Sequence, residues 1–176
     1  LNKKKSNSIN FIIGGSNKYF KFNEDTQNKI FNDLIFLSKI SLVNVIPSRR
    51  TPSQFIKKLA MIRNQNLKLF TDLFDPVTYG RLLSEAKMQI VTWDSISMIS
   101  EAISSETGTF LYKFEEDSCP KRYQLFHQMV EQRGFLKNFS RDVKPYTISM
   151  NNYNSELKSK ILNKIQSNLL FKNSVS

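Results

Sequence analysis

Apolar segments rich in β-branched residues alternate with segments of helical periodicity, and this alternation constrains the fold more than any other feature. Strands are predicted over residues 8–13, 41–46, 88–91 and 109–114. Helices are predicted to begin at Asn23, at Thr51-Pro52, at Asp75-Pro76, at Asp94 or Ser95, and at Pro120. Thr51 is expected to cap the second of these helices. Residues 66–74 fit either a third strand or a helical turn. The order predicts β-α-β units, and hence an α/β fold with a Rossmann-like parallel sheet and helices on both faces.

The size and composition favour one globular domain. The chain has 176 residues, of which 40% are hydrophobic and 23% charged, enough to bury a core. Residues 1–7 are polar and basic and are interpreted as a linker or boundary segment. Residues 8–176 are predicted to form a single domain that ends in an amphipathic helix through Leu157, Ile161, Leu162 and Ile165.

The charge balance predicts an affinity for anions. Lys and Arg number 26 against 15 Asp and Glu, a formal net charge of +11. Because the basic residues are scattered and aromatic residues do not interleave with them, nucleic acid is a disfavoured partner. An anionic membrane surface is an alternative partner. No apolar run reaches the roughly 20 residues of a membrane span, so we expect a cytoplasmic protein, with peripheral membrane attachment as the alternative.

Few residues suggest a metal or a cofactor. Cys119 is the one cysteine, which excludes an internal disulfide and a cysteine-based metal site. His127 is the one histidine, and it lies on a predicted helix without a partner cluster. We therefore interpret His127 as a packing or surface residue, and we expect neither a bound metal nor a cofactor.

The turn after the strand 88–91 is a candidate phosphate site. Asp94 or Ser95 is expected to cap the following helix, whose first-turn amides attract anions. Hydroxyl groups of Ser95, Ser97 and Ser100 are placed to donate to a phosphate, and Glu101 is placed to accept from ribose hydroxyls. The competing interpretation is an ordinary capped helix with exposed serines.

Two other loops leave predicted strands at the same edge of the sheet. Gly14-Gly15-Ser16 permits a tight turn or a close approach of a ligand. Ser48, Arg49 and Arg50 follow the second strand, where the arginines either clamp a phosphate or remain solvated. Since ligands of parallel sheets bind at the carboxyl ends of strands, the convergence of all three loops predicts a nucleoside diphosphate ligand.

Three motifs add a resemblance to a known family. They are the run Phe11–Phe22, the Pro-Ser-Arg-Arg-Thr-Pro segment at 47–52, and the Asp-Ser-x-Ser-Met-x-Ser-Glu-Ala core of 92–102. Together, over about residues 8–150, the chain resembles the carboxy-terminal half of the mitochondrial-fission ELM-type family. Bacterial members of that family are often labelled nucleoside-diphosphate-sugar epimerases. The chain has neither the Gly-x-Gly-x-x-Gly turn nor the Tyr-x-x-x-Lys pair of an ordinary epimerase.

The resemblance implies a donor-binding domain like that of GT-B glycosyltransferases. It implies that Ser95, Ser97 and Met98 line the diphosphate site, that Glu101 lies near the ribose, and that Arg49 and Gly14-Gly15 face the phosphates. It also implies an amino-terminal domain, absent from this sequence, that would carry the acceptor site and the catalytic base. No catalytic residue is therefore assigned here.

Two functional hypotheses follow from these observations. The first is a nucleotide-sugar-binding domain of a glycosyltransferase-like protein, whose partner is a nucleoside diphosphate or a nucleotide-sugar donor. The alternative is a non-catalytic protein-interaction module of the mitochondrial-fission type with a degenerate nucleotide site. For the plant members, the resemblance suggests that such a module recruits a dynamin-like protein.

Overall fold

The computed structural model describes residues 6–71, 75–114 and 119–150. These residues form one parallel sheet of six strands in the order β3-β2-β1-β4-β5-β6, together with five helices. The strands are β1 (Ser8–Ile13), β2 (Leu42–Pro47), β3 (Leu67–Leu69), β4 (Met88–Thr92), β5 (Thr109–Tyr112) and β6 (Leu136–Asn138). The helices are α1 (Glu24–Ser38), α2 (Ser53–Ala60), α3 (Pro76–Glu85), α4 (Ile96–Ser104) and α5 (Lys121–Gln132). The predicted Rossmann-like fold class is confirmed.

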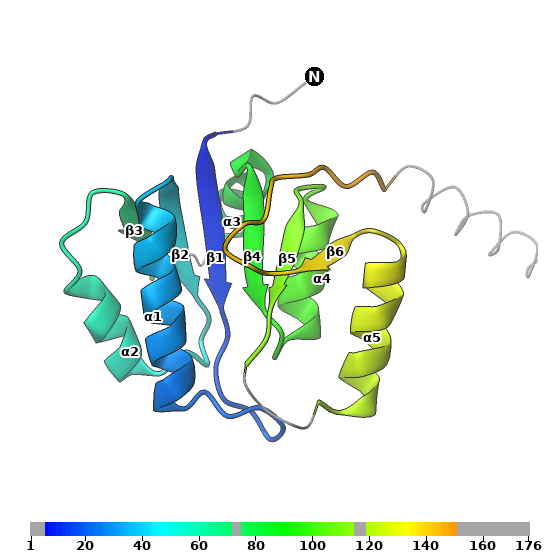
Figure 1. Ribbon diagram of the computed structural model, residues 1–176, viewed down its shortest axis with the longest axis horizontal. Coiled ribbons are helices and arrows are strands. Elements are labelled where there is room, and N and C mark those ends of the chain that lie inside the picture. The colour runs from blue at the N-terminus through cyan, green and yellow to red at the C-terminus, as the bar shows by residue number, and fades with distance from the viewer. Residues whose placement is uncertain (1–5, 72–74, 115–118, 151–176) are drawn as a thin grey trace, which may run out of the picture.

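The strand order reverses at β1, which pairs with β2 on one side and with β4 on the other. In Figure 1, α1 and α2 lie over one face of the sheet, α3 and α4 lie behind it, and α5 lies beside β6. The six strands are parallel, and the arrowheads of β1 and β4 in Figure 1 point toward the edge where the long loop between β1 and α1 lies. Ligands of such folds bind in the crevice where the strand order reverses, so this edge is the first place to look for a site.

The core explains why the central strands are apolar on both faces. All six residues of β1 and all five of β4 are buried, as expected for strands with helices on either side. Asn10 is a polar exception in β1. Its amide donates to the carbonyl of Leu82 at 2.9 Å and its side-chain oxygen accepts from Asn44 at 2.9 Å, so this buried polar group is satisfied.

The five helices begin at or next to the predicted positions. Asn23 and Asp75, which lie at two of these predicted helix starts, cap α1 and α3. For α4, where two residues were candidates, Ser95 is the cap and accepts from the amide of Met98. The prediction that Thr51 caps α2 is wrong. Pro52 occupies that position, and the Thr51 hydroxyl instead lies 2.9 Å from the carbonyl of Ile13 and 2.7 Å from that of Gly14.

Strand predictions were accurate in the centre of the sheet and weaker at its margins. The ambiguous segment 66–74 contains β3, and the expected strand 109–114 ends at Tyr112. β6 was not predicted, because its three residues are too few to show an alternating pattern and only Leu136 is buried. The acidic loop at 115–117 and the helix predicted through Leu157, Ile161, Leu162 and Ile165 lie outside the described residues.

Within the described ranges, none of the helices has both the length and the apolar character that crossing a bilayer requires. The same residues contain no cluster of three or more side chains suited to metal binding.

Candidate functional site

The three loops singled out in the sequence contact one another at the carboxyl edge of the sheet. The Gly14 amide donates to the Thr92 hydroxyl at 2.8 Å, and the Gly15 amide donates to the Asp94 carboxylate at 3.1 Å. From the loop after β2, Arg50 Nη2 lies 2.8 Å from the same Asp94 oxygen, Oδ2. Asp94 therefore links the ends of β1, β2 and β4.

The two glycines allow this close approach. A Cβ on Gly15 would lie 1.9 Å from the backbone carbonyl oxygen of Arg50, and a Cβ on Gly14 would lie 2.1 Å from Oδ2 of Asp94. A larger residue at Gly15 would require the loops to separate, and one at Gly14 would displace the Asp94 side chain. The close approach that the sequence suggested is thus made by the protein's own loops, while the phosphate-facing role of the glycines stays a prediction.

A hollow of about 360 Å³ opens next to this junction. Its walls come from the loop after β1, from Arg50, from the start of α4 and from the start of α5. Three cationic side chains border it, those of Lys18, Arg50 and Arg122, against the single carboxylate of Asp94; the remaining lining residues are Asn17, Tyr19, Ser95, Ile96, Ser97 and Tyr123. The hollow lies where the strand order reverses, and it combines positive side chains with a helix N-terminus, which suits an anionic ligand.

Four of the predicted site residues line the hollow: Arg50, Asp94, Ser95 and Ser97. The others have different contacts. The Ser16 hydroxyl accepts from the amide of Phe22, and the Ser48 hydroxyl accepts from the amide of Arg50. Arg49 is exposed and does not border the hollow. The remaining predicted residues outside the lining are Gly14, Gly15, Met98 and Glu101.

Glu101 faces α3 rather than the hollow. Its carboxylate accepts from the Tyr79 hydroxyl at 3.2 Å. Burial, and then the charge of Glu101, raise the pKa of Tyr79, so Tyr79 stays a neutral hydrogen-bond donor at physiological pH. The predicted ribose contact of Glu101 stays a prediction.

Sequence reasoning missed the contributions of the loop after β1 and of α5. Lys18 and Tyr19 follow the Gly-Gly turn, and the Lys18 ammonium lies 4.6 Å from the centre of the Tyr19 ring. A hydrogen bond with Lys18 lowers the pKa of Tyr19. Arg122 comes from the first turn of α5, after β5. Because β5 lies next to β4 in the sheet, the helix that follows β5 begins at the same edge. A basic residue at the start of that helix was the sequence signal for Arg122.

His127 is a packing residue, as the sequence suggested. Only 5% of it is exposed, and its ring stacks on Trp93 with centroids 6.4 Å apart and planes inclined by 17°. Burial lowers the pKa of His127 to about 4. The imidazole is therefore neutral at physiological pH and belongs to the core.

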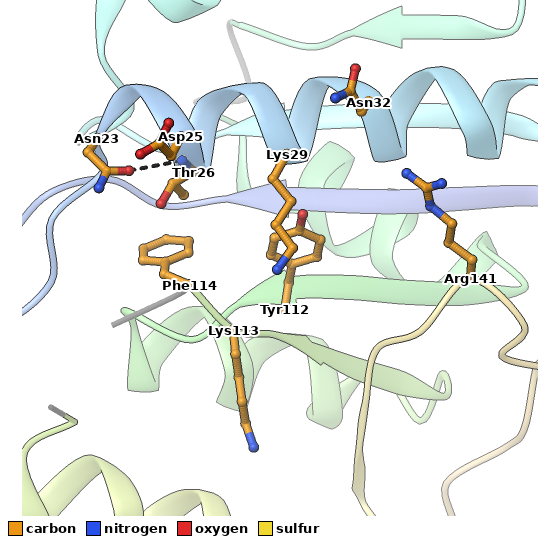
Figure 2. Close-up of a pocket in the computed structure, with 9 residues that line it drawn as sticks. All are labelled: Asn23, Asp25, Thr26, Lys29, Asn32, Tyr112, Lys113, Phe114 and Arg141. Atoms are coloured by element: carbon orange, nitrogen blue, oxygen red, sulfur yellow. Dashed lines mark hydrogen bonds between the residues drawn. The ribbon is translucent and has the colours of Figure 1, made fainter. Parts of the chain in front are cut away.

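A second hollow of about 370 Å³ lies on the face of the sheet between α1 and β5 (Figure 2). Figure 2 shows Lys29 reaching from α1 toward Tyr112, while Arg141 points toward α1 from the other side. One cation of this hollow, Arg141, is paired within the protein. The buried Asp33 carboxylate accepts from the Tyr112 hydroxyl and from Arg141 Nε, each at 2.7 Å. The Arg50–Asp94 pair is a similar internal contact at the edge hollow. The edge hollow is the stronger candidate because it lies at the carboxyl ends of the strands, where the strand order reverses.

Comparison with known proteins gives a family match over nearly the whole chain. Residues 1–164 match the family model described as mitochondrial fission ELM1. The chain is 39% identical over 134 residues to the uncharacterized protein RP120 of Rickettsia prowazekii (strain Madrid E), covering 69% of this chain and 36% of that protein. It is 25% identical over 130 residues to the mitochondrial fission protein ELM1 of Arabidopsis thaliana, covering 73% of this chain and 30% of that protein. The chain thus spans about a third of the length of these relatives.

Proposed function

This chain belongs to the mitochondrial fission ELM1 family, and on that basis we propose that it binds a nucleoside diphosphate, as part of a nucleotide-sugar-binding domain in a glycosyltransferase-like protein. The observation that carries the proposal is the hollow at the carboxyl edge of the sheet. There Lys18, Arg50 and Arg122 surround the N-terminus of α4. A diphosphate group offers the charge and the hydrogen-bond acceptors that this set of donors can match.

The proposed ligand lies with its phosphates against the first turn of α4. The first-turn amides and the Ser97 hydroxyl donate to phosphate oxygens. Arg50 approaches from the side of β2, with a planar guanidinium that suits phosphate oxygens. Lys18 and Arg122 are exposed at the rim and raise the local concentration of anions in a salt-dependent manner. In this role the domain holds a departing diphosphate, and the catalytic base would lie elsewhere in a longer protein.

A second candidate function is a protein-interaction module with a degenerate nucleotide site. One observation favours it: the Gly15 amide and Arg50, two natural phosphate ligands, already bind the Asp94 carboxylate. An internal anion thus occupies part of the place that a phosphate would take. The Arabidopsis relative named for mitochondrial fission is consistent with such a role.

A thermal-shift panel separates the two functions. UDP, GDP, CDP and ADP, with their sugar conjugates, would each be added to the chain. A ligand at 100 times its dissociation constant stabilises by about 2.7 kcal/mol, which shifts melting by roughly 2–4 °C per kcal/mol at this size. The proposal predicts a shift of several degrees. Arg49→Ala should retain it, whereas Arg50→Ala, with binding about tenfold weaker, should roughly halve it because about 1.4 kcal/mol of stabilisation remains. A folded protein that ignores every diphosphate would favour the interaction module.

A further inference from the structure

We infer that Asp94 is the positioning residue of the edge site: it holds Arg50 over the hollow and thereby sets the affinity for the diphosphate. This inference rests on the proposed function and assigns Asp94 a role other than direct contact with the ligand. Three properties of Asp94 carry it, namely its burial, its shared carboxylate oxygen and the hydrogen bond that its backbone carbonyl accepts from Asn17.

The buried position of Asp94 requires a partner for its carboxylate. Its side chain is fully buried, at 0% exposure, and a buried carboxylate is stable only when it is paired and hydrogen-bonded. Oδ2 receives both the Gly15 amide and the Arg50 guanidinium, while Oδ1 has no hydrogen-bond partner among the described residues. The Asp94 backbone carbonyl also accepts from the side chain of Asn17 at 3.1 Å. The residue is thus fixed from several directions.

Arg50 is held in place by this pairing while much of it faces solvent. Its side chain is 36% exposed, and one of its terminal nitrogens contacts Asp94. A guanidinium has five N–H donors in a rigid fork, so donors remain for a ligand in the hollow. A free arginine side chain loses rotamer entropy when a ligand immobilises it. Because Asp94 already fixes Arg50, part of that loss has occurred before the ligand arrives.

Two roles for Asp94 predict opposite effects of removing its charge. If the carboxylate only competes with phosphate for Arg50, Asp94→Asn makes the hollow more positive and tightens anion binding. If Asp94 positions Arg50, the same substitution releases the guanidinium and weakens binding. Asparagine keeps the size of the side chain beside Gly14, so the comparison isolates the charge and the pairing.

The experiment is a double-substitution cycle read by calorimetry. Binding of inorganic pyrophosphate and of the four nucleoside diphosphates would be measured for the wild type, Asp94→Asn, Arg50→Ala and the double variant, with circular dichroism as a check of folding. We expect Asp94→Asn to weaken binding by about tenfold, the range of one charge-assisted hydrogen bond. In the Arg50→Ala background the same change should cause no further loss, because Asp94 acts through Arg50.

The outcomes are distinct. Tighter or unchanged binding by Asp94→Asn, in a wild type that binds, overturns the positioning role and leaves the proposed function standing. An equal loss in both backgrounds also overturns it, since Asp94 would then act through the fold. If the wild type binds none of the probes, both proposals fail. If Asp94→Asn does not fold, Arg50→Ala is compared with Arg122→Ala. We expect the larger loss for Arg50→Ala, because it also leaves an unpaired carboxylate beside the phosphates, and equal losses overturn the inference.

Discussion

Gly15→Ala tests the contact between the loops after β1 and β2. The added Cβ would lie 1.9 Å from the Arg50 carbonyl oxygen and 2.4 Å from its carbonyl carbon, where ordinary contact begins at 3.4 Å. Both atoms belong to the backbone, so no side-chain rotation relieves the clash. The loops must separate by about 1.5 Å, the difference between 3.4 and 1.9 Å. That separation disturbs the Gly15 and Arg50 contacts to Asp94.

The expected cost combines overpacking with weakened charge-assisted hydrogen bonds, on the order of 3 kcal/mol together. For a chain of this size that cost lowers the melting temperature by roughly 6–12 °C. Gly80→Ala is the matched control. Gly80 lies in the exposed middle of α3 with nothing within 4 Å of an added Cβ, so alanine should stabilise by about 0.5–1 kcal/mol.

Thermal and urea unfolding of the two variants, followed by circular dichroism, are the assays. The same samples would be tested for diphosphate binding, which should fall for Gly15→Ala because Arg50 moves with its loop. If Gly15→Ala melts within a degree of the wild type, the loops do not meet as described, and the account of the site built on their contact is wrong.

Four substitutions probe charged and titrating groups. Arg50→Ala should weaken diphosphate binding by about tenfold. Arg49→Ala should weaken it by less than about twofold, because Arg49 does not border the hollow. Equal losses of affinity in calorimetry would contradict this placement of the two arginines. Burial lowers the pKa of His127 from 6.5 to about 4. The unfolded chain therefore takes up this proton first as the pH falls, and stability should decline between these values by on the order of 2–3 kcal/mol. His127→Phe should remove that component of urea-unfolding curves measured against pH. Asp33→Asn should lower the free energy of unfolding by about 1–3 kcal/mol, because it weakens the pairing with Arg141 and Tyr112. A change below about 0.5 kcal/mol in urea unfolding, the range of an ordinary surface substitution, would refute this prediction.

The central fold could be predicted from the sequence because its strands are buried on both faces. β1, β2 and β4 are mostly apolar, with few polar residues among the β-branched and other apolar ones. The alternation with helices predicts that these strands are parallel. The strands at the margins of the sheet have weaker sequence patterns. β6 has one buried residue, Leu136, and its pairing with β5 is a long-range contact that no local pattern encodes. Threonine is common at helix caps, but the Thr51 hydroxyl lies within hydrogen-bond distance of two backbone carbonyls at the end of β1, those of Ile13 and Gly14.

The candidate site was predictable as a place but not in its individual side chains. Strand direction alone brings the three loops to one edge. The choice between Arg49 and Arg50 depends on the turn that follows β2, in which the Ser48 hydroxyl accepts from the Arg50 amide. Lys18 and Arg122 depend on the loops after β1 and β5, which sequence reasoning did not compare. The role of Asp94 depends on burial, and a carboxylate next to a cap position gives no sign of it.

The Arg50–Asp94 pair also bears on the choice between the two proposed functions. A phosphate site whose cations repel one another in the empty state would depend on its ligand for stability. Here Asp94 neutralises Arg50 from within the protein, and Gly15 supplies a further hydrogen bond. We therefore expect the loops to stay folded without a nucleotide. The same edge can consequently serve as a live diphosphate site or remain as a folded surface after binding is lost. The diphosphate affinity of variants at Arg50 and Asp94, rather than their stability, therefore distinguishes the nucleotide-binding domain from the interaction module.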